Sequence, residues 1–308
     1  MKKIIFAVLI AAVAGLTSCR KNEVDPDVKQ FDEEQIQAYI KNNAITGMLR
    51  DTSGIYYKIL TPGTGPSMAY ADSVSLVFTL KTVDGKYTSA DTINNHYSDY
   101  LGHLGIKGYP ESLQSALLNL AKRYGTRLRL LVPSHIGYGL NGVGQGSSTT
   151  ENVRIDGNQC LDYYIHIINK IPGDNQNTYD EQVIKNYITA NSLTGYQRSA
   201  SGLYYTVTRP GIGDAKITDN TTITAFYTVS LLNGFVFNQY NTEPATSLDI
   251  PDLIKGVQEG LKAAGTSGAK LSFLIPSYLA YGKQGITTLS VPGNSCLRFD
   301  VQVVNVTP

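Results

Sequence analysis

The fold is decided by a stretch near the end of the chain, Leu274-Ile275-Pro276-Ser277-Tyr278-Leu279-Ala280-Tyr281-Gly282, followed by Gly293-Asn294-Ser295-Cys296-Leu297-Arg298-Phe299-Asp300-Val301. This stretch predicts a strand that ends in a proline turn, a loop punctuated by glycine, and a strand of mainly alternating apolar residues. An earlier copy reads Leu131-Val132-Pro133-Ser134-His135-Ile136-Gly137-Tyr138-Gly139, and its second strand follows at Gly157-Asn158-Gln159-Cys160-Leu161-Asp162-Tyr163. Two copies of one motif in 308 residues predict two domains of the same fold.

Each copy is preceded by the same series of elements. A short amphipathic helix is predicted over 32–43, with Asp32 as its N-cap, and a similar helix begins at Asp180. The strand at 52–60 and its Pro-Gly-x-Gly ending return at 200–208, 148 residues later. The repeat therefore extends over nearly the whole of each domain.

Turn and helix signals complete the outline. Asp84-Gly85 and Asn233-Gly234 predict one hairpin in each copy. A single clear helix is predicted inside the second copy at 251–264, with Pro251 at its first position and Gly265 just beyond its end. One helix packed on a twisted antiparallel sheet gives an α+β fold for each domain.

The N-terminus differs from the rest. Met1-Lys2-Lys3 is a positive segment, and residues 4–16 are apolar but too few to span a bilayer. The ending Leu16-Thr17-Ser18-Cys19 resembles a bacterial lipobox, which implies removal of residues 1–19 as a lipoprotein signal and lipidation at Cys19. Residues 20–31 then form a tether. We expect a protein of the cell envelope, lipid-anchored to a bacterial membrane, with the outer membrane favoured and a periplasmic or surface face.

The division that follows is a first domain at 32–171, a linker at 172–179 and a second domain at 180–308. Cys160 and Cys296 occupy the same motif position in different domains, which places them too far apart for a disulfide. We expect both to be small buried apolar groups.

Several functional classes find no support in the composition. The formal charge is +1, and the densest basic run (Lys122, Arg123, Arg127 and Arg129) is more typical of a solvated turn than of a nucleic-acid surface. The four histidines have no metal-ligand spacing, so neither a metal nor a cofactor is expected. The glycines at 142, 144 and 146 are better explained by a mobile loop than by a phosphate site.

From Gly202 to Val306 the second copy resembles an FKBP-type peptidyl-prolyl cis-trans isomerase. The resemblance is specific through the order and spacing of its segments, which are 201–205, Phe226-Tyr227-Thr228, 233–237, 253–257, Ala280-Tyr281-Gly282 and Phe299-Asp300-Val301. The arrangement with a helix before the first strand resembles that of the periplasmic branch of the family, which is related to macrophage infectivity potentiators. The first copy resembles the family more weakly, through its first strand, Tyr138-Gly139 and its last strand.

The resemblance implies two tandem FKBP-like domains and rotation about X-Pro bonds in the second. That rotation has a barrier of about 20 kcal/mol and needs no nucleophile or metal. A water-poor aromatic pocket lowers the barrier by weakening amide resonance and holding the twisted geometry. The residues carried over as catalytic are Tyr227, Phe237, Asn238, Ile254, Tyr281 and Phe299, and those carried over as substrate-binding are Leu253, Val257 and Val291.

Two departures from the family lower the expected activity. Asn238 stands where aspartate is usual, and Val257 stands where tryptophan is common. The first copy departs further, because Phe78 replaces the tyrosine, the second ring falls near Thr88 or Ser89, and no counterpart of Leu253-Ile254 is evident. We expect it to be a folded domain with little or no isomerase activity, which serves polypeptide binding or dimerisation.

The sequence is therefore compatible with two functions. The first is an isomerase, weakly active and mainly in the second domain, that assists the folding of envelope or secreted proteins with prolyl polypeptides as substrates. The alternative is a non-catalytic lipoprotein whose FKBP-like domains bind polypeptide as a chaperone.

Overall fold

The computed structural model describes residues 27–145, 152–170, 175–213 and 215–307. The signal segment 1–19, the lipidation site Cys19 and most of the tether lie outside the described residues, as do residues 172–174 of the linker. Within the described ranges, no helix is both long enough and apolar enough to cross a bilayer. We refer below to 27–170 as the first unit and to 175–307 as the second unit.

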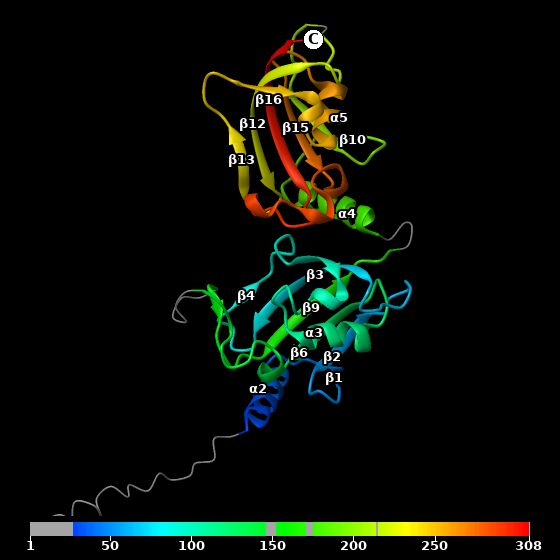
Figure 1. Cartoon of the computed structure of the whole chain (residues 1–308), viewed down its shortest axis with the longest axis vertical. Helices are drawn as coiled ribbons and strands as arrows, with labels where there is room; N and C mark the ends of the chain where they lie inside the picture. Colours follow the sequence, from blue (N-terminus) through cyan, green and yellow to red (C-terminus); the bar gives the residue numbers. More distant parts are fainter. Residues whose placement is uncertain (1–26, 146–151, 171–174, 214, 308) are drawn as a thin grey trace, which may run out of the picture.

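Each unit is built on an antiparallel sheet of seven strands with one shared topology (Figure 1). In the first unit the order is β1-β2-β6-β9-β3-β4, with β5 also paired to β3; in the second it is β10-β11-β15-β16-β12-β13, with β14 paired to β12. The first-unit strands are β1 (Leu49–Arg50), β2 (Tyr56–Thr61), β3 (Ser73–Thr82), β4 (Thr88–Ser89), β5 (His96–Tyr100), β6 (Arg127–Val132) and β9 (Leu161–Ile167), and a separate hairpin joins β7 (Val143–Gly144) to β8 (Arg154–Ile155). The second-unit strands are β10 (Gln197–Arg198), β11 (Tyr204–Arg209), β12 (Thr222–Leu231), β13 (Val236–Tyr240), β14 (Thr246–Asp249), β15 (Lys270–Ile275) and β16 (Leu297–Thr307).

One helix covers the inner face of each sheet. In the second unit this is α5 (Lys255–Ala264), and in the first it is α3 (Glu111–Ala116), which continues as a π-helical segment (Leu117–Ala121). Two glycines bring α5 close to the sheet: a Cβ at Gly256 would lie 2.4 Å from Ile275, and one at Gly260 would lie 2.7 Å from the Phe273 ring. The predicted α+β fold with a short helix on a twisted sheet is confirmed.

The entry helices begin earlier than the sequence predicts. Helix α2 spans Val28–Asn42 and is capped by Asp27, whose side chain accepts from Lys29 N–H, so the N-cap prediction for Asp32 is wrong and residues 28–31 are helical rather than tether. Helix α4 spans Gln176–Ala190 and is capped by Asn175, which shortens the predicted linker. In both cases a capping residue upstream extends the helix by a turn, and the next carboxylate points inward.

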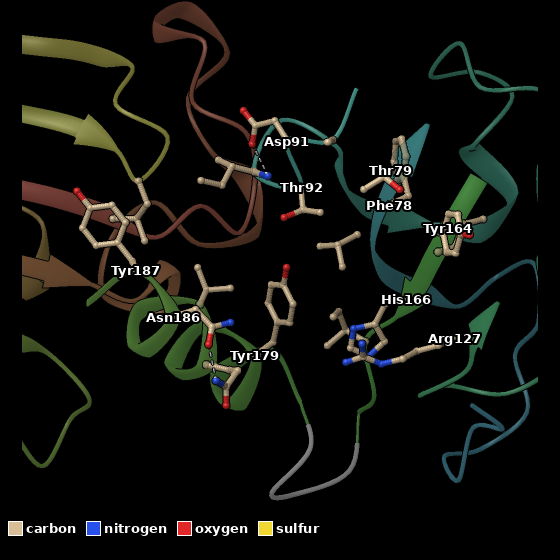
Figure 2. A pocket seen from close by; sticks show the side chains of 18 of the residues that line it. Phe78, Thr79, Asp91, Thr92, Arg127, Tyr164, His166, Tyr179, Asn186 and Tyr187 are labelled. Atoms are coloured by element: carbon tan, nitrogen blue, oxygen red, sulfur yellow. Dashed lines mark hydrogen bonds between the residues drawn. The ribbon is translucent and has the colours of Figure 1, made fainter. Parts of the chain in front are cut away.

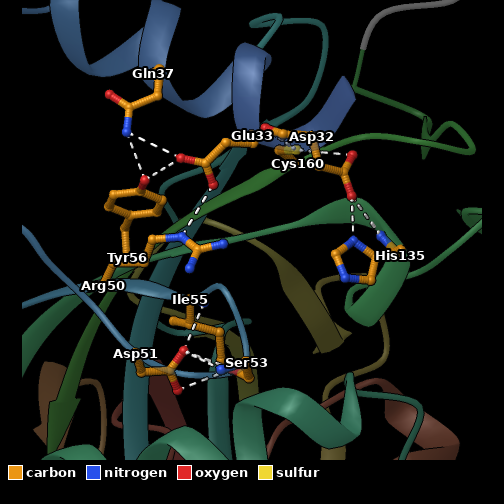
Figure 3. Close-up of polar contacts among 10 residues, drawn as sticks. All are labelled: Asp32, Glu33, Gln37, Arg50, Asp51, Ser53, Ile55, Tyr56, His135 and Cys160. Atoms are coloured by element: carbon orange, nitrogen blue, oxygen red, sulfur yellow. Dashed lines mark hydrogen bonds and ion pairs between the residues drawn. The ribbon is translucent and has the colours of Figure 1, made fainter. Parts of the chain in front are cut away.

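Those inward carboxylates hold the proline turns. Asp180 is fully buried, and its Oδ2 accepts from Ser277 N–H at 2.9 Å and from Ser277 Oγ at 2.6 Å. In the first unit Asp32 accepts from Ser134 Oγ at 2.6 Å and from His135 N–H at 3.0 Å, and His135 Nδ1 lies 2.6 Å from the same carboxylate (Figure 3). The same helix-to-turn bond therefore closes both units.

The repeated cysteines lie beside this bond. Cys160 and Cys296 are free and buried, and each thiol faces the backbone oxygen of its unit's aspartate, at 3.9 Å and 3.8 Å respectively. Burial and the nearby Asp32 raise the pKa of Cys160 to about 12. Both thiols are thus small packed groups, as the sequence predicts.

The structure confirms the hairpin turns and the predicted end of α5 at Gly265, but not its start, because Pro251 lies in a separate 3-10 turn (Ile250–Asp252) and α5 begins at Lys255. Gly85 and Gly234 have φ of 77° and 92°, in the left-handed region that a two-residue hairpin turn requires. Gly265 has φ of −77°, so the helix α5 does not end in a left-handed glycine. A Cβ there would meet Leu261 O at 2.5 Å and Ile217 Cδ1 at 2.6 Å, so close packing rather than a special φ favours glycine at this position.

The buried Asp180 predicts a measurable pH dependence of stability. Burial raises the pKa of its carboxyl to about 6, against the opposing hydrogen bonds from Ser277 and Gln176. The folded state therefore retains a proton that the unfolded state has lost between about pH 4 and 6, so the free energy of unfolding falls as pH rises through this window, by about 2 kcal/mol. Asp180→Asn keeps an oxygen for Ser277 and should lose this dependence. Urea unfolding of the wild type and of Asp180→Asn at pH 4.5 and 7.5 measures the free energies of unfolding. If the two proteins differed in stability by the same amount at both pH values, the assignment to Asp180 would be contradicted.

Candidate functional site

A stack of three aromatic rings crosses the inner face of the second sheet. Tyr227 on β12 and Phe299 on β16 are stacked, with centroids 5.7 Å apart and an interplanar angle of 12°. Phe273 lies opposite Phe299 in the ladder between β15 and β16 and continues the stack at 6.1 Å. The alternation of the strands thus brings aromatic residues from three strands to one face.

A β-bulge brings a fourth ring to the site. Val229 pairs with Asn238 and Ser230 with Val236, which leaves Phe237 as the extra residue of β13. Bulges turn a side chain away from the regular pleat. Phe237 meets Tyr281 edge to face, with centroids 6.3 Å apart and planes at 68°.

The N-terminus of α5 and two valines complete the site. Val257 and Val291 are buried, and Leu253 and Ile254 pack against the same cluster as the four rings. Ile254 is the N-cap residue of α5, and within the described part of the chain its backbone N–H makes no hydrogen bond. An unpaired donor at the start of a helix is well placed to bind a carbonyl oxygen.

The polar groups of the site are few and uncharged. Burial, with a smaller contribution from the nearby Tyr227, raises the pKa of Tyr281, so its hydroxyl stays protonated and can donate at neutral pH. Asn238 is exposed, and its side-chain oxygen accepts from the Tyr227 hydroxyl at 3.4 Å. The predicted residues contain no carboxylate, imidazole or thiol. The arrangement therefore suits binding and desolvation rather than acid–base or nucleophilic chemistry.

The structure thus gathers the eight apolar and aromatic residues of the predicted site around one cluster, with Asn238 at its edge. The members of the cluster are Tyr227, Phe237, Leu253, Ile254, Val257, Tyr281, Val291 and Phe299. Their roles toward a ligand stay predictions.

The same place in the first unit is filled by the protein itself. Tyr109 meets Phe78, the counterpart of Tyr227, edge to face at 5.7 Å, and it meets Tyr97 at 5.7 Å. Phe78 in turn meets Tyr163, the counterpart of Phe299, at 5.9 Å. Tyr109 and Tyr138, the counterpart of Tyr281, both pack against the apolar cluster of the first unit. A ring of the chain therefore occupies the space between the pocket residues.

The backbone donor of the second unit is absent from the first. Buried positions 113, 116 and 117 of α3 and its continuation have the spacing of 257, 260 and 261 in α5, which aligns the two helices. The N-cap of α3 is then Pro110, with φ −57° and ψ 135°, against φ −61° and ψ 150° at Ile254. Proline has no N–H.

Sequence comparison of the two copies missed Tyr109-Pro110 because the chain takes ten residues from Tyr100 to Pro110 but five from Asp249 to Ile254. The first unit also lacks a counterpart of Phe237, because its hairpin has no bulge. β3 pairs with β4 regularly, through Leu80 and Ser89 and then Lys81 and Thr88, so β4 has no extra residue at that position.

Two hollows of the described residues lie away from the predicted site. A cleft of about 770 Å³ separates the first sheet from α4, and Figure 2 shows Tyr179, Asn186 and Tyr187 on one side and Thr79, Arg127, Tyr164 and His166 on the other. A hollow of about 980 Å³ lies beside His135 and α3. Neither contains any of the nine residues predicted for the site, whereas a third hollow, of about 780 Å³, is lined by one of them, Tyr227, on the side of Tyr196 and Asp300.

A match to a known family decides what the second unit is. Residues 213–304 match the family model of the FKBP-type peptidyl-prolyl cis-trans isomerases. The chain carries an FKBP-type domain. All six residues predicted as catalytic lie within the matched range of this FKBP-type domain, and so do Leu253, Val257 and Val291.

Relatives of the chain carry the same description. It is 38% identical over 127 residues to the FKBP-type peptidyl-prolyl cis-trans isomerase FkpA of Buchnera aphidicola, which covers 41% of this chain and 50% of the relative. Identity to FkpA of Escherichia coli K12 is 37% over 115 residues, or 37% and 41% of the two chains. The crystal structure of FkpA from Escherichia coli aligns with a TM-score of 0.38 at 34% identity, over 42% of this chain and 61% of that one. The chain thus spans about half the length, or less, of these curated relatives.

The Ile254 N–H, which has no partner among the described residues, indicates where a prolyl peptide would bind. A titration with a proline-containing tetrapeptide, followed by amide NMR, should shift the signals of Ile254 and Tyr281, because a bound carbonyl changes the environment of both. Signals of Leu113 and Tyr138 should stay in place, since the first unit is filled by Tyr109. Shifts confined to the first unit would overturn this placement.

Proposed function

We propose that the chain is a peptidyl-prolyl cis-trans isomerase of modest activity, with its FKBP-type domain as the active one. The observation that carries the proposal is the Ile254 N–H, which has no hydrogen bond within the described residues; Ile254 packs against the same cluster as the rings of Tyr227, Phe237, Tyr281 and Phe299, and none of the predicted site residues is charged. The aromatic rings provide an apolar surface for a proline ring, and the Ile254 N–H provides a fixed hydrogen-bond donor for the neighbouring carbonyl. In the first unit Pro110 removes that donor.

The chemistry follows from amide resonance. The X-Pro bond is kept planar by amide resonance, which separates charge between the nitrogen and the carbonyl oxygen. Hydrogen bonds from water stabilise this charge-separated planar form. An apolar pocket withdraws the water and so reduces the barrier of about 20 kcal/mol. Tyr227 and Phe299 pack on the proline ring, and Ile254 N–H and the Tyr281 hydroxyl bind oxygens in the twisted geometry.

Two residues limit the rate. Val257 is smaller than the tryptophan common in the family, so it holds the proline ring less firmly. Asn238 keeps an oxygen for the Tyr227 hydroxyl but lacks the negative charge of aspartate. Activity below that of a typical family member follows from both.

We also propose that the protein works in the cell envelope, anchored by lipid on Cys19 to the outer membrane, on prolyl segments of envelope or secreted proteins. The support is the lipobox-like Leu16-Thr17-Ser18-Cys19 after a short apolar segment.

A second candidate function is polypeptide binding without catalysis. It is favoured by the occluded pocket of the first unit and by Asn238 and Val257 in the second. A chaperone of this kind would suppress aggregation of clients irrespective of their proline content. The two functions are separable because only the first depends on the Tyr281 hydroxyl.

Substitutions in the FKBP-type domain should lower isomerisation of a prolyl tetrapeptide by the full chain. Phe237→Ala removes one wall, and we expect at least a tenfold loss of kcat/KM; Tyr281→Phe removes one donor, and we expect a loss of about fivefold. Tyr138→Phe, the matched change in the first unit, is the control and should have no effect. A protease-free cis/trans assay measures all three. A wild-type rate equal to the thermal rate would leave only the binding function.

Lipidation has its own test. Cys19→Ser should abolish incorporation of labelled palmitate in a bacterial host and release the protein from the membrane fraction, because the cysteine thiol is the acceptor of the lipid. Lys21→Ser, two residues away, should change neither. Unaltered labelling of the Cys19→Ser protein would contradict the anchor.

A further inference from the structure

The first unit contacts two elements of the second unit, the β12–β13 hairpin that carries Phe237 and the loop that carries Tyr281. The rings of Phe237 and Tyr281 meet edge to face in the predicted site. On β12–β13, the turn residue Asn233 donates from Nδ2 to Asp91 Oδ2 of the first unit at 2.6 Å. The loop between β15 and β16 carries Tyr281, and its residue Asn294 donates from Nδ2 to Ser75 Oγ at 3.2 Å. Ile93, two residues after Asp91, packs against both apolar clusters of the second unit.

Asn294 fixes one end of the Tyr281 loop. Its side chain is almost completely buried, and its backbone N–H donates to Gly282 O at 2.8 Å, one residue after Tyr281. On the first unit, His96 Nε2 lies 2.9 Å from Ser75 Oγ and 3.3 Å from Asn294 Nδ2. Burial lowers the pKa of His96 to about 4, so this cluster is uncharged at neutral pH.

A second chain of hydrogen bonds reaches the other end of the same loop. Ser75 Oγ donates to Gln176 Oε1 at 2.7 Å, and Gln176 Nε2 donates to Asp180 Oδ1 at 2.7 Å. The other oxygen of Asp180 holds Ser277, where the turn that leads to Tyr281 begins. One hydroxyl of the first unit is therefore bonded toward both Ser277 and Gly282, the two residues that bracket the tyrosine.

We propose that Ser75, together with Asp91, is a positioning residue for the prolyl site, and that the first unit supports catalysis by holding the Tyr281 loop and the Phe237 hairpin. The inference rests on the proposed isomerase function. It gives the first unit a role that needs no pocket of its own. The role is local, since the contacts involve the same two elements whose rings lie 6.3 Å apart.

The variants for the test lie in the first unit, outside the FKBP-type domain. Ser75→Ala removes the shared hydroxyl, and Ser75→Thr keeps it; the matching position of β12 is Thr224, so threonine suits this register. Ser98→Ala is the control, because Ser98 is paired with Ser75 in the sheet but has no hydrogen bond to the second unit within the described ranges. All are made in the full chain.

Two readouts decide the matter. In the prolyl tetrapeptide assay we expect Ser75→Ala to lose three- to tenfold in kcat/KM and Ser75→Thr and Ser98→Ala to stay within twofold of wild type. In deuterium exchange followed by mass spectrometry, a peptide covering 277–296 should exchange faster in Ser75→Ala alone. Asp91→Ala should speed exchange in 232–240.

Failure of this inference is distinct from failure of the proposed function. An active wild type with unaltered kcat/KM and exchange in Ser75→Ala would overturn the inference and leave the isomerase in place. An inactive wild type would overturn the isomerase, and exchange over 277–296 would then decide whether Ser75 holds the loop. A general loss of stability is recognised by equal exchange increases in both units, and that result would also count against positioning.

Discussion

The bond between a helix carboxylate and a proline turn is the contact on which each unit depends. Asp32 and Asp180 are buried groups on the entry helices, and each accepts a hydrogen bond from the serine of the Pro-Ser turn that follows an inner strand, β6 or β15. A buried carboxylate is costly unless its oxygens are satisfied, so helix, turn and the adjacent thiol must come together in one arrangement. In the second unit that arrangement fixes the turn from which the Tyr281 loop departs.

The aromatic site is a consequence of the sheet rather than of any one motif. Strand alternation brings Tyr227, Phe273 and Phe299 to one face, and two glycines let α5 approach that face closely enough to present Ile254. The first unit has the same sheet and the same helix, yet its space is occupied. The two units therefore show that the sheet and its helix come with the fold, whereas the open space between the rings and the N–H donor at the helix start are found in the second unit and not in the first.

Local patterns in the sequence predicted the strands and the hairpin turns, because each depends on neighbours a few residues apart, whereas the ring set came from the resemblance to the family. The helix starts were missed since Asp27 and Asn175 are ordinary polar residues until their side chains are seen to cap. Pro110 was hidden by extra residues before α3. The contact between Ser75 and Asn294 joins positions 219 residues apart, and no periodicity or spacing reports such a pair.

The bulge at Phe237 sets a limit on how the two halves can be exchanged by engineering or by descent. The ring enters the pocket as a surplus residue of β13, whereas β4 pairs without one. Point substitution changes a side chain but leaves the residue count of a strand as it was. Converting the first half into a second prolyl site of the same geometry thus calls for an inserted residue in that hairpin, a length change that no series of single-codon replacements can supply.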